Sequence, residues 1–307
     1  MSYYQQRNRG RLTIGEDGNT LVMLILIQLT VFILFSFIKI AYYFTEGAEG
    51  LLMYRRDILA WFILPSNLNT LVSRPWTLIT HFFIHDEVWH LLGNMLWLFG
   101  FGRIFNDLAG ARKLIPVFLY GAVAGALLFV LSYNLIPVLK QNQVPALGAS
   151  AGIMAIAIAT TVMAPQYRIF PMLNGGIPLW VITAVYVIVD LAMIPVSNTG
   201  GHIAHLAGAA AGFIFMTQLL KGRDGSIWMN RSFDWVTNLF NPEKPKRGKV
   251  IKSQLFYKST VPPYKKTTTN FSQQRVDEIL DKINQKGYHT LNAEEKDILK
   301  RASKEDI

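Results

Sequence analysis

The sequence contains no cysteine and few charged residues. Of its 307 residues, 16% are Asp, Glu, Lys or Arg, whereas 51% are hydrophobic. The lack of cysteine excludes disulfide bonds, thiol nucleophiles and thiolate metal sites. The low charge content and the positive mean hydropathy are typical of a membrane protein and argue against a soluble globular domain.

Long stretches without a charged residue dominate the first 220 positions. Five such runs cover 18–38, 114–139, 141–167, 169–189 and 191–220. Each reaches the roughly 20 residues that an α-helix needs to cross a bilayer. A sixth apolar segment, 88–105, is shorter and contains Arg103. We therefore predict an all-α polytopic membrane protein with a bundle of six transmembrane helices, at about 20–44, 89–105, 114–136, 147–164, 177–195 and 202–220.

Basic residues are concentrated on one predicted side of the membrane. They precede the first span, lie between spans two and three, and follow span six. Because Lys and Arg favour the cytoplasmic side, both termini are predicted to be cytoplasmic. Residues 241–270 contain eight Lys or Arg and one acid, Glu243, within a net charge of +10. A basic stretch so close to a span predicts contact with anionic lipids, and not nucleic-acid binding.

Polar side chains gather at the predicted outer end of the bundle. The set contains a serine, an asparagine and five of the six histidines: Ser150, Asn94, His81, His85, His90, His202 and His205. They come from the long loop 45–88 and from the starts of spans two, four and six. Polar groups at membrane depth are costly and tend to be functional. Their common depth therefore predicts a site at this end.

Ser150 opens the fourth span within the stretch GASAG. On that stretch alone, close packing of small residues explains the pattern as well as a nucleophile does. A serine in the first turn of a helix lies near unpartnered N–H groups and the positive end of the helix dipole, which favour an oxyanion. Gly208, Ala209 and Gly212 share a helix face with His205 and would let that helix approach Ser150. His205 could then take the serine proton.

Three separated motifs and one loop motif resemble those of a known family: HLLGN at 90–94, GASAG at 148–152, AHLAGAAAG at 204–212 and RPWTLITHFFIH at 74–85. Over residues 20–220 the chain resembles the rhomboids, which are intramembrane serine proteases. The resemblance implies a Ser-His dyad without an acid, with Ser150 as nucleophile and His205 as base. It also implies that His90 and Asn94 stabilise the oxyanion.

The resemblance further implies an endopeptidase that cuts transmembrane helices of other membrane proteins near their outer ends, with no cofactor and no metal. The short compact chain and its basic tail favour a bacterial-type rhomboid in the inner (cell) membrane. Three positions depart from the rhomboid pattern. Gly is usual directly after the serine, an aromatic four residues after it, and Trp-Arg in the outer loop, whereas this chain has Ala151, Met154 and Trp76-Thr77. These departures bear on how efficiently a rhomboid protease would cleave its substrate more than on whether the chain resembles that family.

Asp190 is a carboxylate near the outer end of span five, which is an expensive position for a charge. It could orient His205 as the third member of a triad. We interpret it instead as a gate or loop contact.

Two other functional classes stay open. A non-catalytic rhomboid-like protein would bind or escort membrane helices, although the presence of both Ser150 and His205 argues against it. A metal-dependent protein would use the histidine cluster, with His81 and His85 at i and i+4. The HExxH motif of metalloproteases is absent from the sequence, which weakens that hypothesis.

The chain is predicted to have four parts: a cytoplasmic tail at 1–19, the protease core at 20–220, an interfacial helix and basic linker at 221–270, and a helical hairpin at 271–307. Within 226–240, aromatic and aliphatic residues share one helical face, as in helices that lie on a membrane surface. In the hairpin, two apolar stripes are separated by Gly287 and by a possible helix cap, Asn292 with Glu295. The hairpin is either a weakly folded appendage or a docking or regulatory element.

Overall fold

The computed structural model describes residues 20–170, 172, 175–239 and 273–305. The chain divides into two compact units, 1–242 and 243–307. Helices dominate both units, which confirms the predicted all-α class. Among the described residues, the strands are β1 (Arg168–Ile169) and β2 (Ile177–Pro178), which form one short antiparallel pair.

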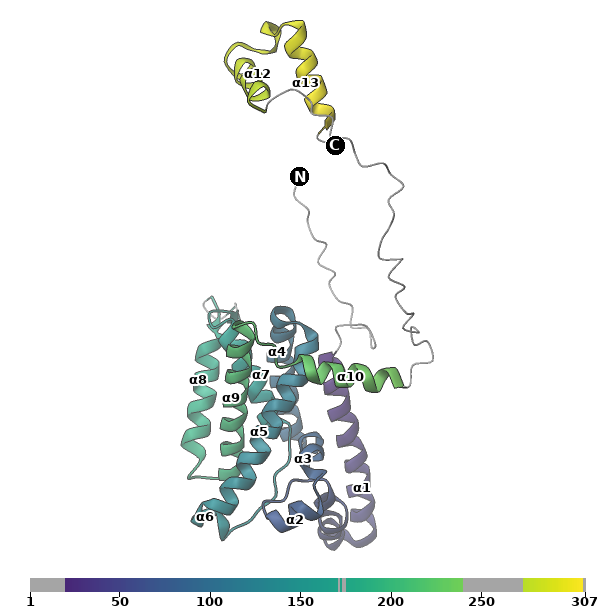
Figure 1. Cartoon of the computed structure of the whole chain (residues 1–307). Coiled ribbons are helices and arrows are strands. Elements are labelled where there is room, and N and C mark those ends of the chain that lie inside the picture. Colours follow the sequence, from purple (N-terminus) through teal and green to yellow (C-terminus); the bar gives the residue numbers. More distant parts are fainter. Residues whose placement is uncertain (1–19, 171, 173–174, 240–272, 306–307) are drawn as a thin grey trace. The chain divides into compact units, whose positions relative to one another are not determined.

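The larger unit is a bundle of long helices, with α1 and α8 at opposite edges (Figure 1). Its members are α1 (Thr20–Asp57), α4 (Val88–Ala109), α5 (Leu114–Leu135), α7 (Ser150–Met163), α8 (Leu179–Met193) and α9 (Thr199–Leu220). Each overlaps one predicted span. Three described segments are long and apolar enough to cross a membrane, Thr20–Trp61, Ala111–Leu135 and Thr199–Leu220, and α7 and α8 are shorter apolar helices. The chain is an integral membrane protein.

α1 extends well beyond the predicted end of the first span at residue 44. It continues to Asp57 through a kink at Gly47, where φ is 59° and ψ is −130°. Glycine adopts a positive φ without the steric cost that a side chain would add. Acidic residues end the apolar pattern here without ending the helix. The predicted outer loop is therefore helical at its start and continues through short helices, η1 (Leu59–Trp61), α2 (Leu68–Ser73), α3 (Thr77–Thr80) and η2 (His81–Phe83).

α7 lies in the centre of the bundle. Nine of its 14 residues are buried, and it packs against α4, α5 and α9. The segment that leads into it, after α6 (Pro137–Lys140), is held by two backbone hydrogen bonds of 2.8 Å between Leu64 and Ala146. A helix that is apolar on all sides is most stable where other helices surround it.

Small residues let the neighbours of α7 come very close. A Cβ added at Gly208 of α9 would lie 2.1 Å from the carbonyl oxygen of Ala151, and one at Gly212 would lie 2.1 Å from that of Ala155. On α5, a Cβ at Gly121 would lie 2.3 Å from the Cβ of Ala155. The glycines that share a helix face with His205 therefore bring α9 against α7 as the sequence predicts.

α10 (Ile227–Leu239) follows α9 after a short turn. Asp234 of α10 pairs with Arg112, which precedes α5, with 2.6 Å between carboxylate and guanidinium. Trp228 donates its indole N–H to the hydroxyl of Tyr120 on α5 at 2.5 Å. The helix predicted within 226–240 is thus present, and its place on a membrane surface stays a prediction.

The smaller unit is described by α12 (Gln273–Lys286), η4 (Tyr288–Thr290) and α13 (Ala293–Glu305). Its core is formed by Ile279, Leu291 and Ile298. The predicted cap is confirmed: the Asn292 N–H donates to the Glu295 carboxylate at 2.9 Å, and the Glu295 N–H donates to Asn292 Oδ1 at 2.8 Å. The predicted basic linker lies outside the described residues.

Candidate active site

Ser150 is the first residue of α7, and a tight turn delivers the chain to it. Gly148 has a φ of +109°, and its N–H donates to the carbonyl oxygen of His81 at 2.9 Å. A Cβ at Gly148 would lie 2.7 Å from the ring of His90. Glycine is therefore required here both for backbone conformation and for space. The turn places the serine at a helix N-terminus, where the first N–H groups lack intrahelical acceptors.

His205 lies in α9 directly opposite this helix start. Its Nε2 is 2.7 Å from Ser150 Oγ, which is hydrogen-bonding distance. The close approach of α9 to α7 at Gly208, one turn after His205, produces this contact. The sequence prediction that these two helices meet at a serine and a histidine is therefore met by the geometry. Their chemical roles stay predictions.

Asp190 of α8 binds the other side of the same histidine. Its side chain is 2% exposed, and Oδ1 lies 2.9 Å from Nδ1 of His205 and 2.6 Å from Nδ1 of His202. Its other oxygen, Oδ2, is buried and has no hydrogen-bond partner among the described residues. This contact favours the alternative role of Asp190, the orientation of His205, over a gate or loop contact, because the carboxylate is hydrogen-bonded to the imidazole that touches Ser150. The role of Asp190 stays a prediction.

A serine hydroxyl, an imidazole and a carboxylate thus lie in series across three helices. In this order a carboxylate can hold the Nδ1–H of the imidazole and leave Nε2 to accept the serine proton. The arrangement can therefore support nucleophilic attack by a hydroxyl. Two signals in the sequence point to Asp190: it is the only charged residue between 169 and 220, and two histidines three residues apart begin the next span.

His90 and Asn94, predicted to stabilise an oxyanion, lie on α4 beside the turn that precedes Ser150. A Cβ at Gly148 would lie 3.7 Å from Asn94 Nδ2. That amide nitrogen is 2.8 Å from Nε2 of His85, and the rings of His85 and His90 meet edge to face at 5.1 Å. The two side chains therefore border the site, and Asn94 is held by a histidine of the preceding loop.

The sequence places His85 and His81 in the outer loop and in the polar cluster that predicts a site, and in the structure both are buried. Burial lowers the pKa of His85 to about 4, with a smaller contribution from nearby His90. Burial also lowers the pKa of His81 to about 4, and its Nδ1 lies 2.8 Å from the carbonyl oxygen of Thr77. Both rings are therefore neutral near pH 7. A neutral ring at His85 can accept the hydrogen bond from Asn94.

Residues 72–222 match the family model of the Rhomboid domain. The chain belongs to the rhomboid family. It is 26% identical over 162 residues to RHOMBOID-like protein 12, mitochondrial, of Arabidopsis thaliana, covering 49% of this chain and 48% of the relative. It is 30% identical over 151 residues to Rhomboid protein 1, mitochondrial, of Saccharomyces cerevisiae, covering 47% of this chain and 42% of the relative. This rhomboid thus spans less than half the length of either relative.

Residues 266–305 match a separate family of unknown function, DUF6576.

The three departures from the rhomboid pattern have local explanations. Met154 is fully buried, and the aromatic neighbour of His205 is instead Tyr186 of α8, with ring centroids 6.3 Å apart at 69°. Ala151 fits because α5 has a glycine opposite it, Gly125, where a Cβ would lie 2.6 Å from that of Ala151. Thr77 is buried and its hydroxyl donates to the carbonyl oxygen of Arg74 at 2.7 Å. Each of the three residues is therefore accommodated by its neighbours in this protein.

The described residues include one group that could hold a metal ion, formed by Asp190, His202 and His205, whose ligand atoms lie within 4.8 Å of one another. It is not the pair considered from the sequence, His81 and His85, which are occupied by separate hydrogen bonds. Binding of a cation would replace both hydrogen bonds to Asp190. The same contacts orient the histidine beside Ser150, so a metal and a triad are alternative uses of these atoms.

Proposed function

We propose that this rhomboid-family protein is an intramembrane serine endopeptidase that cleaves transmembrane helices of other membrane proteins. The observation that supports it most strongly is the 2.7 Å contact between Ser150 Oγ and His205 Nε2. The membrane spans of the proposal are the six long helices of the larger unit, with the site near the outer end and both termini cytoplasmic. Since both relatives are named mitochondrial, the bacterial inner membrane stays a prediction.

In the proposed reaction, His205 Nε2 removes the Ser150 proton while Oγ attacks the carbonyl carbon of the scissile peptide bond. The oxyanion accepts hydrogen bonds from N–H groups in the first turn of α7 and from Asn94, once its amide leaves His85. The imidazolium then protonates the leaving amine, the C–N bond breaks, and an acyl ester remains on Ser150. A water molecule, deprotonated by the same imidazole, then attacks the ester carbonyl; the ester C–O bond breaks, the imidazolium returns its proton to Ser150 Oγ, and the second product leaves as a carboxylic acid.

We extend the proposal to Asp190 as the residue that positions His205. A carboxylate at 2.9 Å from Nδ1 accepts the Nδ1–H, which keeps Nε2 free to receive the serine proton. It also offsets the charge of the imidazolium that forms during attack. Burial of Asp190 makes this effect strong, because water screens the two groups little. The proposed machinery is therefore Ser-His-Asp, in place of the dyad that the family resemblance implies.

The test is labelling of the full-length protein in mild detergent with a fluorophosphonate probe. An ordinary serine hydroxyl is too weak a nucleophile to react, so labelling reports activation. We expect labelling at Ser150 that is absent in Ser150→Ala, falls steeply in His205→Ala and is unchanged by a metal chelator. Cleavage of a model transmembrane substrate should show the same pattern.

Two outcomes would contradict the proposal. Chelator-sensitive cleavage that survives Ser150→Ala would indicate a metal mechanism at Asp190, His202 and His205. A folded protein that neither labels nor cuts, but still binds membrane helices, would indicate the escort function.

A further inference from the structure

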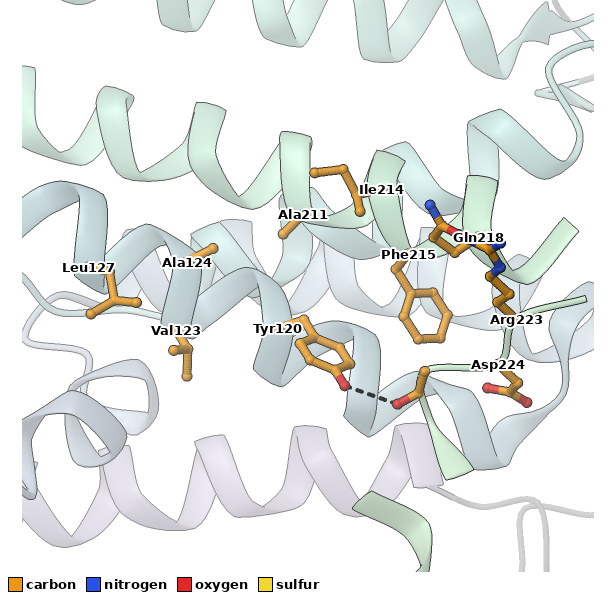
Figure 2. A pocket seen from close by; sticks show the side chains of 11 residues that line it. Tyr120, Val123, Ala124, Leu127, Ala211, Ile214, Phe215, Gln218, Arg223 and Asp224 are labelled. Atoms are coloured by element: carbon orange, nitrogen blue, oxygen red, sulfur yellow. Dashed lines mark hydrogen bonds between the residues drawn. The ribbon is translucent and has the colours of Figure 1, made fainter. Parts of the chain in front are cut away.

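A groove runs along the outside of the larger unit between α5 and α9 (Figure 2), and Ser150 is not among the residues that line it. Its volume is about 660 Å³, within the roughly 300–1,000 Å³ of small-ligand sites. Val123 and Leu127 of α5 and Ala211 and Ile214 of α9 form its apolar walls, and Gln218 and Arg223 lie at one end. The groove therefore has an aliphatic part and a polar end.

The aliphatic walls of the groove are exposed on the outer surface of α5 and α9. Leu127 is 51% exposed and Ile214 is 58% exposed, although α5 and α9 both have the length and apolarity of membrane spans. Small residues, Ala124 and Ala211, leave the hollow between these larger side chains. In a bilayer the molecules available to fill an apolar hollow on such a face are lipid acyl chains.

The polar end of the groove carries the positive charge of Arg223. Among the described residues, the side chain of Arg223 makes one hydrogen bond, from Nη1 to Gln218 Oε1 at 3.5 Å, and no ion pair. The neighbouring acid, Asp224, is already engaged: its Oδ1 accepts the N–H and hydroxyl of Ser226 at 2.8 and 2.6 Å, and its Oδ2 lies 3.9 Å from Lys113 Nζ. Arg223 is thus available to an anion.

Aromatic residues mark this end as the level of the lipid headgroups. Tyr120 borders the groove and donates its hydroxyl to the carbonyl oxygen of Gly225 at 2.9 Å (Figure 2). It also accepts the indole N–H of Trp228, at the start of α10. Tyr and Trp favour the membrane–water interface. From Tyr120 to Leu127 the helix rises about 10 Å, so the groove leads from the interface into the hydrocarbon.

We propose that this groove binds one anionic phospholipid, with an acyl chain along α5 and α9 and the phosphate paired with Arg223. Guanidinium groups bind phosphate oxygens bidentately, which gives this end its selectivity for a phosphate. The apolar walls exclude a purely polar anion as the complete ligand. The site is separate from Ser150 and does not depend on the proposed protease function.

The experiment measures lipid retention by native mass spectrometry of the full-length protein in mild detergent, with phosphatidylglycerol, phosphatidylcholine or inorganic phosphate added. We expect wild-type protein to retain one phosphatidylglycerol in preference to phosphatidylcholine. Arg223→Gln should lower phosphatidylglycerol retention about tenfold, as expected for loss of one charged hydrogen-bonding group. Ala211→Leu should lower retention of both lipids because the added side chain fills the hollow.

Arg231→Gln is the matched control, because Arg231 is an exposed arginine of α10 that does not line the groove. It should retain phosphatidylglycerol like the wild type. Equal retention by wild type, Arg223→Gln and Ala211→Leu would overturn the proposal and indicate non-specific surface lipid. Binding of inorganic phosphate that competes fully with phosphatidylglycerol would also overturn it, since the acyl chain would then contribute nothing. Helix content and elution volume of each variant confirm that it is folded.

Discussion

Replacing Gly208 with alanine tests how helix spacing controls the site. The added Cβ would lie 2.1 Å from the carbonyl oxygen of Ala151, about 0.9 Å inside the 3.0 Å limit of real Cβ contacts. The obstacle is backbone, so α9 and α7 must separate by about that distance. Adding it to the 2.7 Å between Ser150 and His205 gives about 3.6 Å, at which the hydrogen bond is lost.

A misplacement of about 1 Å can cost roughly 10²-fold in rate. We therefore expect Gly208→Ala to label with a fluorophosphonate about 100-fold more slowly than the wild type, measured as a time course on folded, detergent-solubilised protein. Gly100→Ala is the matched control, because a Cβ at this helical glycine of α4 meets no atom within 4 Å. It should label at the wild-type rate.

Two results would refute this reasoning. If folded Gly208→Ala labels as fast as the wild type, close helix packing does not set the geometry of Ser150 and His205. If Gly100→Ala slows labelling as much as Gly208→Ala, the loss comes from adding a methyl group to any membrane helix and not from the clash with Ala151.

Three further predictions concern single side chains and pH. Asp190→Asn should lower the labelling rate by about 10²–10⁴-fold by disfavouring the required tautomer of the base, and a modest change measured in the same assay would restore its interpretation as a gate. Asn94→Ala should lower kcat for a transmembrane substrate by about 10²–10³-fold with little change in KM, because a donor to the oxyanion acts in the transition state; an equal change in KM would place Asn94 on the substrate path. For His81 and His85, burial lowers the pKa from 6.5 to about 4, so the unfolded chain binds more protons between these values and stability should fall as the pH drops from 6.5 towards 4. Thermal unfolding in detergent, measured across this pH range, tests the predicted loss of stability. An unfolding temperature that does not change with pH would mean that the two rings are protonated alike in the folded and unfolded states.

Several of the long helices could be located from the sequence because charge-free runs mark them, whereas α4 contains Arg103 and α8 contains Asp190. The run that ends at residue 167 contains α7, and the run from 191 to 220 contains α9. The continuation of α1 to Asp57 could not be predicted this way, because polar residues beyond residue 44 are compatible with a helix outside the membrane. A run of apolar residues shows which part of a helix lies in the hydrocarbon, but it does not show where the helix ends.

The meeting of Ser150 and His205 was predictable from motifs and from the small residues that let their helices approach. The contact of Asp190 with His205 could be named from the sequence as one alternative but not chosen over a gate, because it depends on the rotation of α8 about its axis, and α8 is apolar around most of its surface. Likewise, nothing in the spacing of His85 reveals that its ring reaches Asn94 from the preceding loop. Which side chains from distant parts of the sequence contact one another can be seen only in the three-dimensional structure.

α7 contains 14 residues, which is about 21 Å of helix, whereas the hydrocarbon core of a bilayer is about 30 Å thick. For α7 as one of the six proposed spans, the roughly 9 Å difference falls on the non-helical segments at its ends or on a local thinning of the bilayer, because α4, α5 and α9 enclose it. Non-helical backbone is stable at that depth only where protein or water surrounds it. In the proposed protease, the shortness of α7 therefore places Ser150 up to about 9 Å closer to water than the end of a full-length span would be.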